Sequence, residues 1–446
     1  MNPAKRFEKA TRSPRRRGGI RGALRIRPLP LAAAVLAAAA CSEEAEPEPE
    51  VVKLPCDTRI DVPEGFCAIV FHSGVGAARE LAVADNGDVF VAIRNRGGQS
   101  GGVVALRDTD DDHKAETRES WGTEGGSGIA LGDGILYLAT DNDVLRYTLP
   151  KGSLTPSGSP VKIVEDLPSA RNHPRKSIAL HPDGSIFVGI GSPSNACQIR
   201  PRSREGPGQD PCPQLETRAG IWRFDGDKEG QTLSDGQRFS TGVRNANAMA
   251  VHPTTDELYA VVHGRDQLYE LWPDLYTAEE GAEKPSEEFI HVREGTDFGW
   301  PYCYHDPEDD AKLLAPEYGG DGETVGRCAD MDDPEIGLPA HWAPNAMAFA
   351  NGEFQEDYRE GAFVAFHGSW NRTPVQEGYN VVWLPFDDDQ PTGDWAVFAD
   401  GFAGGPISSP GDADNRPTGV AAGPEGSLFV SESLRGRIWK IVAVEE

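Results

Sequence analysis

One short pattern recurs six times along this chain and constrains its fold more than any other feature. Each copy has a short apolar stretch, a turn rich in Asp, Gly, Asn or Pro, and a second apolar stretch, which is typical of a β-hairpin. Successive copies are about 50 to 100 residues apart, and the shorter spacings match one four-stranded blade of a propeller. The copies begin at Leu81, Ile129, Ile178, Met249, Met347 and Val420.

A third apolar stretch accompanies each hairpin, so the chain is expected to be all-β, a six-bladed β-propeller. The chain ends on such a stretch, and residues 65–74 (GFCAIVFHSG) resemble an outer fourth strand. Pairing these N- and C-terminal strands in one blade would close the ring and remove an open sheet edge. The alternative is an all-β array of two domains, but no interior linker divides residues 55–446. The third strands are expected at 101–108, 142–149, 219–225, 266–272, 378–386 and 436–444.

The N-terminus has the features of an export signal. Residues 1–40 are basic and end in the apolar run Leu31–Ala40. The Ala run before Cys41 resembles a bacterial lipoprotein cleavage box, which predicts lipidation of Cys41; the alternative is a simple secretory cut. Residues 41–54 are acidic and contain proline, as in a disordered tether. The expected location is therefore periplasmic or on the outer surface, with the membrane contacted by the lipid anchor only.

Six further cysteines form an even set, which in an exported chain indicates disulfides. Fifteen pairings of six cysteines are possible, and sequential pairing is favoured because each bond would close a short local segment. Long loops are expected at 198–218 and 272–342, and a cysteine pair associated with each favours ordered loops. The expected bonds are Cys56–Cys67, Cys197–Cys212 and Cys303–Cys328.

Charge and polar residues narrow the ligand class. The formal net charge of −28 argues against nucleic acid, whose phosphates require a basic face. Yet Arg, Asn and His recur beside the hairpins, where propeller loops meet at one rim. This pattern fits a pocket for a polyanionic ligand, because guanidinium groups pair with carboxylates; hydrogen bonds between blades are the open alternative. The residues are His173, Arg244, Asn245, His341, Asn345, His367, Arg372 and Arg416.

Several of these stretches resemble the sorbosone dehydrogenase group of soluble pyrroloquinoline quinone (PQQ) sugar dehydrogenases. The resemblance extends from about Gly65 to the C-terminus, with the motifs in order around the six repeats. It implies a six-bladed propeller and a quinoprotein that oxidises an aldose or aldehyde-sugar by hydride transfer to PQQ. The motifs lie at 241–253, 295–304, 338–349, 361–372 and 415–432.

The resemblance also implies residue roles. The family's general base is a histidine 18 residues before a glycine, a separation that His173 and Gly191 reproduce. Asn172 stands where the best-known branch has an acidic partner for that base. The cofactor contacts map to Arg244, Asn245, Arg416 and His341, and Arg372 is closest to the position of a cofactor-binding lysine. A glutamine that contacts the cofactor in the family has no counterpart here.

Calcium is expected at two places. The family's calcium is held by two successive backbone carbonyls and the quinone, and those carbonyls map to Gly264 and Arg265. Separately, residues 108–119 follow EF-hand ligand spacing, although His113 stands where glycine makes the sharp turn. A solvated acidic hairpin tip is the alternative. The loop ligands would be Asp108, Asp110, Asp112 and Glu119, with Glu116 at the ninth position.

Three functions are compatible with these patterns. The first is an exported PQQ-dependent sugar dehydrogenase with a small sugar or polyol as substrate. Because the sequence has no CxxCH haem motif, its electrons would pass to a separate acceptor, cytochrome c or a quinone. The second is a non-catalytic propeller lipoprotein that binds carbohydrate or protein, favoured by the missing glutamine and lysine. The third is a propeller lactonase, which needs acidic metal ligands at the channel centre, whereas these loops supply mainly Arg, His and Asn.

Overall fold

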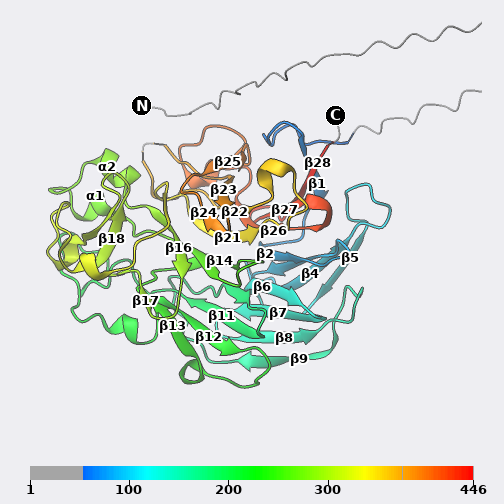
Figure 1. The fold of residues 1–446 in the computed structure, drawn as a ribbon, viewed down its shortest axis with the longest axis horizontal. Coiled ribbons are helices and arrows are strands. Elements are labelled where there is room, and N and C mark those ends of the chain that lie inside the picture. The colour runs from blue at the N-terminus through cyan, green and yellow to red at the C-terminus, as the bar shows by residue number, and fades with distance from the viewer. Residues whose placement is uncertain (1–53, 374, 445–446) are drawn as a thin grey trace, which may run out of the picture. The chain divides into compact units, whose positions relative to one another are not determined.

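The computed structural model describes residues 54–373 and 375–444 and is a six-bladed β-propeller (Figure 1). In Figure 1 the chain colour passes around a ring of small sheets, from blue through green to red. Within the described residues no helix is long and apolar enough to cross a membrane. The predicted leader, Cys41 and nearly all of the predicted tether lie outside the described residues.

Each blade is built on four antiparallel strands, of which the first is innermost; the short edge strand β17 (Thr296–Asp297) of blade 3 pairs in parallel. Blade 1 contains β2 (Ala78–Val83), β3 (Val89–Ile93), β4 (Gly102–Arg107) and β5 (Thr117–Trp121). Blade 2 contains β6 (Gly126–Gly132), β7 (Ile135–Thr140), β8 (Val144–Thr148) and β9 (Ser157–Val164). Blade 3 contains β10 (Ile178–Leu180), β11 (Ser185–Ile190), β12 (Gly220–Asp225) and β13 (Gln237–Thr241), with β17 (Thr296–Asp297) at its edge.

The second half of the ring follows the same order. Blade 4 contains β14 (Ala246–Val251), β15 (Leu258–Val262), β16 (Glu287–Val292) and β20 (Ile336–Leu338). Blade 5 contains β21 (Pro344–Phe349), β22 (Gly361–Phe366), β23 (Val381–Asp387), β24 (Gln390–Pro391) and β25 (Ala396–Ala399). Blade 6 contains β26 (Pro417–Ala422), β27 (Leu428–Glu432), β28 (Ile438–Ala443) and β1 (Phe66–His72).

The ring closes as the sequence predicts. Strand β1 pairs antiparallel with β28, so the first described strand completes the last blade. In Figure 1 this is the place where blue β1 lies beside red β28. The closure leaves no free edge between the first and last blades, which the two-domain alternative would have required.

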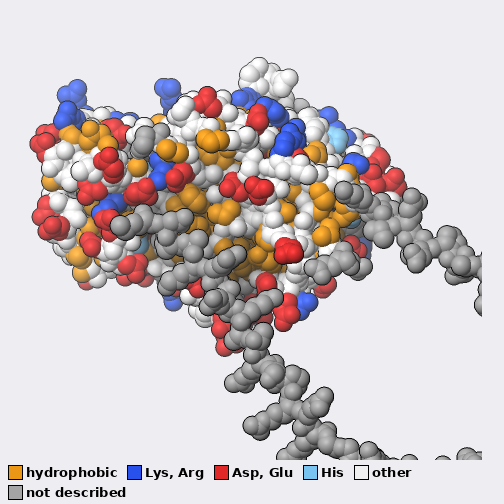
Figure 2. Space-filling model, turned by 90° about the horizontal axis from the view of Figure 1, so that it is seen from above, with side chains coloured by type: hydrophobic (Ala, Val, Ile, Leu, Met, Phe, Trp, Pro, Cys, Tyr) orange, Lys and Arg blue, Asp and Glu red, His pale blue; other side chains and the backbone are white. Residues whose placement is uncertain are grey.

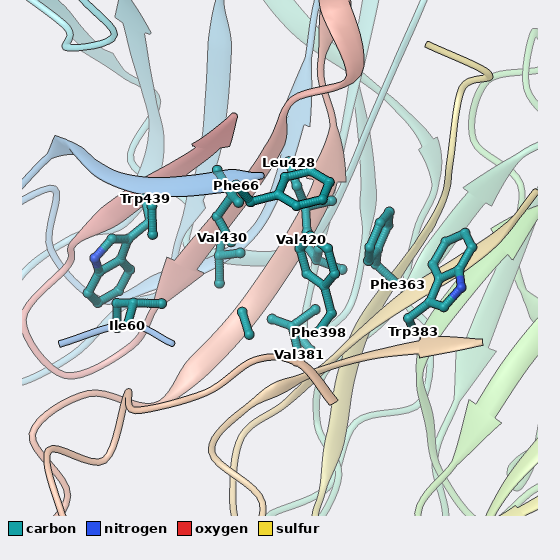
Figure 3. Packing of buried hydrophobic residues seen from close by; sticks show 14 of the residues in the cluster. Ile60, Phe66, Phe363, Val381, Trp383, Phe398, Val420, Leu428, Val430 and Trp439 are labelled. Carbon is teal, nitrogen blue, oxygen red and sulfur yellow. The ribbon is translucent and has the colours of Figure 1, made fainter. Parts of the chain in front are cut away.

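Hydrophobic side chains from adjacent blades form the core. Figure 3 shows the cluster between blades 5 and 6, where Phe363 and Trp383 lie on one side and Val420, Val430 and Trp439 on the other. Both faces of the middle strands are buried, as in β22, where all six residues are buried. Because neighbouring blades share each cluster, the loops at the ends of the strands are held in fixed positions around the channel.

The sequence-based assignment of blade 4 was wrong in one strand. Residues 266–272, expected to form its third strand, contain the helix α1 (Leu268–Leu271), and the third strand is β16. Leu268 and Leu271 are buried and three residues apart, a helical spacing that a short apolar run does not distinguish from a strand. The segment 272–342 is consequently not one loop. It contains two strands of blade 4, the edge strand β17 of blade 3, the helix α2 (Ala278–Glu283) and a separate hairpin of β18 (Cys303–Asp306) and β19 (Ala311–Leu314).

The three predicted disulfides are confirmed. Cys56–Cys67 ties the N-terminal segment to β1, and Cys197–Cys212 closes the loop between β11 and β12. Cys303–Cys328 fixes the segment that follows β18. The loops at 198–218 and 303–328 are therefore cross-linked, and the first of them borders the site described next.

Candidate functional site

A pocket of about 410 Å³ lies at one end of the propeller channel. Its walls come from two kinds of loop, those entering the inner strands and those leaving the second strands. Both kinds lie at the same end because the first two strands of each blade are antiparallel. We call this cavity the central pocket; its lining residues include Arg94, Asn172, His173, Arg175, Asn195, Arg202, Arg244, Asn245, His263, Asp266, His367 and Trp370.

His173 lies in the loop before β10, as predicted, and lines the central pocket. Its Nδ1 is 2.8 Å from the backbone carbonyl oxygen of Ser192. The carbonyl can only accept, so Nδ1 carries the proton and donates, which leaves the lone pair of Nε2 free. Asn172, which replaces the expected acidic neighbour, instead donates to the carbonyl of Pro193 at 3.1 Å. A backbone carbonyl therefore orients the imidazole in place of a carboxylate.

Gly191 permits the close approach of His173 and Asn245. A Cβ atom at Gly191 would lie 2.6 Å from both Asn245 Oδ1 and His173 Cβ. This contact gives a physical reason for the 18-residue separation noted in the sequence. Asn245 is itself 3% exposed and lines the central pocket. Within the described residues its side-chain amide forms no hydrogen bond, so it is available to a ligand.

Arg244 is the centre of a buried polar network. Its guanidinium donates to Asp266 Oδ2 at 3.0 Å, to Asn195 Oδ1 at 3.1 Å and to the carbonyl of Gly264 at 2.7 Å. Asn195 and the backbone of Asp266 exchange two hydrogen bonds of 2.8 Å. Burial raises the pKa of Asp266, but the Arg244 guanidinium outweighs it and brings that pKa down to about 2. The pair is therefore charged and fixed before any ligand arrives.

The lining of the central pocket carries an excess of positive charge. Five arginines and one carboxylate, Asp266, lie in its wall. Arg202 and Arg244 share Asp266, whereas the ion pairs of the described chain include no partner for Arg94, Arg171 or Arg175. Because the chain as a whole has a net charge of −28, this excess is a local property of the pocket. The donor set fits a small ligand with several carboxylates.

His263 is a further histidine of this site. It follows β15 directly, lines the central pocket, and donates from Nε2 to the carbonyl of Pro344 at 2.7 Å. Burial, with added repulsion from Arg244, lowers the pKa of both His173 and His263 to about 3. Both imidazoles are accordingly neutral at physiological pH.

We expect acid to destabilise the protein through these two histidines. Below pH 6.5 these two histidines bind protons in the unfolded chain but stay unprotonated in the folded state. The free energy of unfolding therefore falls as pH falls from 6.5 towards 3. Each histidine contributes a loss of up to about 2 kcal/mol between pH 6.5 and pH 5. Urea unfolding at pH 6.5 and 5 should show a smaller loss for His263→Gln than for wild type. An equal loss in His263→Gln and wild type would contradict this account.

Arg416 lies behind the pocket wall and is absent from the pocket lining. Its guanidinium donates to the carbonyls of His367 and Gly368 at 2.9 and 2.6 Å, and it lies over the ring of Tyr379. His367 does line the pocket, and its Nε2 is 2.8 Å from Ser433 Oγ. Arg244 and Arg416 thus lie at the same rim, as predicted, but only Arg244 lines the pocket.

Two of the predicted cofactor contacts lie outside the lining of the central pocket. His341 Nε2 donates towards the carbonyls of Gly281 and Lys284, at 3.0 and 3.1 Å, and neither His341 nor Arg372 lines the central pocket. Arg372 donates to the carbonyl of Ala282 and pairs with Glu283 and Glu377. Both side chains bind backbone carbonyls at the C-terminal end of α2, a helix inserted between β15 and β16. Their role in this structure is to hold that insertion.

The backbone segment predicted to bind calcium borders the central pocket. The carbonyl of Gly264 faces the guanidinium of Arg244, and the Gly264 N–H donates to Glu287 Oε2 at 2.7 Å. Glu287 also accepts from Ala343 N–H at 3.0 Å and is 2% exposed. The side chain of Arg265 points to Glu317, with Nη2 2.9 Å from Oε1. These contacts fix the turn, so that any metal at this place must be bound by its backbone oxygens.

The acidic loop of blade 1 brings four carboxylates together, but not the predicted set. Oxygen atoms of Asp108, Asp110, Asp112 and Glu116 lie within 4.8 Å of one another. Glu119 is instead in β5, opposite Ala105, and the structure does not include it in this group. Strand β5 begins at Thr117, before the twelfth loop position. The loop is thus followed by a strand, whereas the loop of an EF-hand is followed by a helix. Calcium binding by this loop stays a prediction.

Asn195 and His263 were not predicted from the sequence. Both follow the second strand of a blade, whereas most of the predicted side-chain contacts precede the first strand. The available signal was the polar run after the second apolar stretch, such as SPSNA at 192–196. Since both loops of a hairpin reach the same rim, both supply candidate residues.

Comparisons with known proteins agree with this geometry. The family model described as TrAA12-like matches residues 60–444. A PQQ-dependent sugar dehydrogenase of Hypocrea jecorina is 23% identical over 391 residues, covering 83% of this chain and 81% of that protein. A PQQ-dependent pyranose dehydrogenase of Coprinopsis cinerea is 28% identical over 187 residues, covering 38% of this chain and 23% of that protein. The chain spans less than half the length of the first curated relatives it matches.

A solved structure confirms the fold independently of sequence identity. The calcium structure of a Trichoderma reesei protein of carbohydrate-active enzyme family AA12 matches with a TM-score of 0.70. The match covers 86% of this chain and 97% of that one at 19% sequence identity. At 19% sequence identity this similarity establishes the propeller fold, whereas the ligand class depends on the residues of the central pocket.

Proposed function

Because the chain belongs to the TrAA12-like family, we propose that it is a quinoprotein oxidoreductase that oxidises an aldose or aldehyde-sugar with PQQ. The observation that carries this proposal is the central pocket, where five arginines and a neutral, oriented histidine surround one cavity. PQQ is a planar quinone with three carboxylates, so the excess of unpaired arginines fits it. The relatives in Hypocrea jecorina and Coprinopsis cinerea are named for PQQ-dependent activities on sugars.

Arg244 and Asn245 would hold the cofactor, together with Arg175. Arg244 is fixed by Asp266 and Asn195, and Asn245 presents an amide with no internal partner. Among the residues that the structure describes, the Arg175 side chain has Asn345 Oδ1, at 3.5 Å, as its one hydrogen-bond partner. When bound, PQQ would supply a two-electron acceptor. Arg244, already held by Asp266 and Asn195, would orient it.

His173 would be the general base. Its Nδ1–H donates to the Ser192 carbonyl, which directs the unprotonated Nε2 to act on a sugar hydroxyl. Its pKa of about 3 describes the pocket without a ligand, where burial and Arg244 oppose protonation. A polyanion beside Arg244 would offset that repulsion and raise the pKa of His173, making Nε2 a better proton acceptor.

A calcium ion would bind at the carbonyls of Gly264 and Arg265. Backbone oxygens suit this hard cation, which would polarise a quinone oxygen. The Gly264 carbonyl already accepts one hydrogen bond from Arg244, so calcium would need the second lone pair of that oxygen. The solved relative in Trichoderma reesei is described as a calcium structure.

The sorbosone-type motifs support an aldose or aldehyde-sugar as substrate. The leader and Cys41 support export to the periplasm or outer surface with a lipid anchor, and the three disulfides agree with export. Electrons would leave to a separate carrier, cytochrome c or a quinone. The lactonase alternative is disfavoured because Asp266 is the one carboxylate of the central pocket lining.

We expect turnover after reconstitution with PQQ and calcium. The assay is oxidation of a panel of aldoses and ketoaldoses with an artificial electron acceptor, and protein without PQQ is the control. At least one sugar should give a rate that depends on PQQ and saturates with the sugar. Tight PQQ binding without turnover on any sugar would instead favour the non-catalytic propeller.

A further inference from the structure

A second cavity, of about 780 Å³, lies beside the central pocket over blade 1. Arg94, which follows β3, lines both cavities. The turn between β27 and β28 also lies between the two cavities and contacts residues of both. Ser433 of that turn accepts from Arg96 Nη1 through its carbonyl at 3.1 Å and contacts His367 of the central pocket through its hydroxyl. The two cavities are therefore neighbours that share a wall.

This second cavity, which we call the arginine cleft, has an unusual charge. Four arginines, Arg94, Arg96, Arg118 and Arg435, line it, and its lining includes no Asp or Glu. The whole chain has 71 Asp and Glu against 43 Lys and Arg. Figure 2 shows one face of the molecule, on which acidic and basic side chains lie among hydrophobic and uncharged ones. A cavity whose charged lining residues are all arginines differs from such a mixed surface.

Three of these charges are uncompensated. Arg435 pairs with Asp414 at 2.6 Å, but the ion pairs of the described chain include no carboxylate within 4.0 Å of Arg94, Arg96 or Arg118. Arg96, Arg118 and Arg435 are exposed to solvent, so their mutual repulsion is small, but together the arginines give the cleft a positive potential that attracts anions. Guanidinium groups pair best with carboxylates, and the hydrogen bonds are directional. The charge pattern thus indicates a ligand with carboxylate groups.

The remaining walls suit a sugar chain. Backbone of glycine-containing segments forms much of the cleft, and partly buried Trp121 adds an aromatic surface whose orientation is fixed by a hydrogen bond from Nε1 to the Leu154 carbonyl at 2.9 Å. A recess that lies beside the central pocket and shares Arg94 with it fits an extended small chain better than the broad face of a protein. The acidic surface elsewhere would repel a long polyanion, which favours a short one.

We propose that the arginine cleft binds the carboxylate-bearing units of a uronate-containing oligosaccharide whose reducing end lies in the central pocket. This inference rests on the proposed function and specifies its substrate class. The reducing-end sugar would meet His173, while Arg96 and Arg118 bind a carboxylate on a following unit. The acid group would then affect substrate affinity and not the chemical step.

The test compares two disaccharides with the same reducing end. Cellobiouronic acid differs from cellobiose only in a carboxylate on the non-reducing unit. Calorimetric titration of protein without PQQ should show binding of the acid at least about fivefold tighter than of cellobiose. The double variant Arg96→Gln/Arg118→Gln should lose this preference and bind cellobiose as wild type does. Arg293→Gln, an exposed arginine on blade 4, is the matched control and should keep the preference.

Kinetics with PQQ and calcium separates the two hypotheses. The acid should have the higher kcat/KM through a lower KM at similar kcat, and the preference should shrink as salt screens the charges. A binding preference without turnover of either sugar would reject the proposed function and support the cleft. Turnover of both sugars with no preference in wild type would reject the cleft. If the double variant instead slows only electron transfer to an acidic cytochrome c, the cleft is an acceptor site and the inference is wrong.

Discussion

His173→Ala is expected to lower kcat at saturating sugar by at least about 100-fold and to leave PQQ affinity within about twofold of wild type. The structure gives two reasons. The Ser192 carbonyl fixes the Nδ1–H tautomer, so that Nε2 is the acceptor nitrogen, and His173 lines the same pocket as Arg244 and Asn245. Loss of the imidazole removes the proton acceptor but none of the positive charges that would bind the cofactor. The measurement is steady-state turnover after reconstitution, with PQQ affinity from absorbance titration.

His181→Gln is the control for this experiment, because His181 lies in the turn after β10, outside the pocket lining. It should turn over at the wild-type rate. If His173→Ala were as fast as wild type, His173 would not be the base, and His263 and His367 would become the candidates within the central pocket.

Arg244→Gln is expected to weaken PQQ binding by about 10- to 150-fold, which corresponds to the loss of one charged hydrogen bond of about 1.5–3 kcal/mol. The same change leaves the buried Asp266 with Arg202 as its nearest cation, at 3.3 Å, so the variant should also be less stable. The double variant Arg244→Gln/Asp266→Asn removes both charges and should recover stability without recovering PQQ affinity.

Arg416→Gln provides the comparison. Arg416 binds two carbonyls behind the pocket wall and is absent from the pocket lining, so its loss should weaken PQQ binding much less than Arg244→Gln does. Affinities should be measured by titration at equal ionic strength, with thermal unfolding to verify that each variant is folded. An equal loss in both arginine variants would show that the pocket geometry described above does not decide cofactor affinity.

The propeller was predictable because its information is local and repeated. Each hairpin contains alternating or fully apolar strands around a turn, and β1 matches a strand missing from the last blade. The exception was α1, because its sequence LYEL is compatible both with a short strand and with one turn of helix. Only the competition with β16 for the edge of β15 decides between them, and that competition depends on residues some 20 positions apart in the chain.

The site was predictable in position but not in every side chain. Loops that precede inner strands must reach the rim, so His173, Arg244 and Asn245 were found. His341 satisfies the same rule and Arg372 follows the second strand of its blade, yet both side chains bind carbonyls in the segment 281–284. The conformation of the long segment between β15 and β16 sets where those carbonyls point, and no sequence pattern specifies it. The predicted placement of Glu119 among the ligands of the acidic loop differs from the structure for a similar reason, because Glu119 pairs with β4 as part of β5.

Absorbance titration of the calcium-loaded protein with PQQ, followed by addition of sugar, tests the central claim most directly. The account predicts saturation at one PQQ per chain and conversion of the bound quinone spectrum to that of its reduced form when a suitable sugar is added. It also predicts that Arg244→Gln shifts the titration to higher PQQ concentration. Absence of saturable PQQ binding, with the protein folded and calcium present, would contradict the assignment of the central pocket as a quinone site.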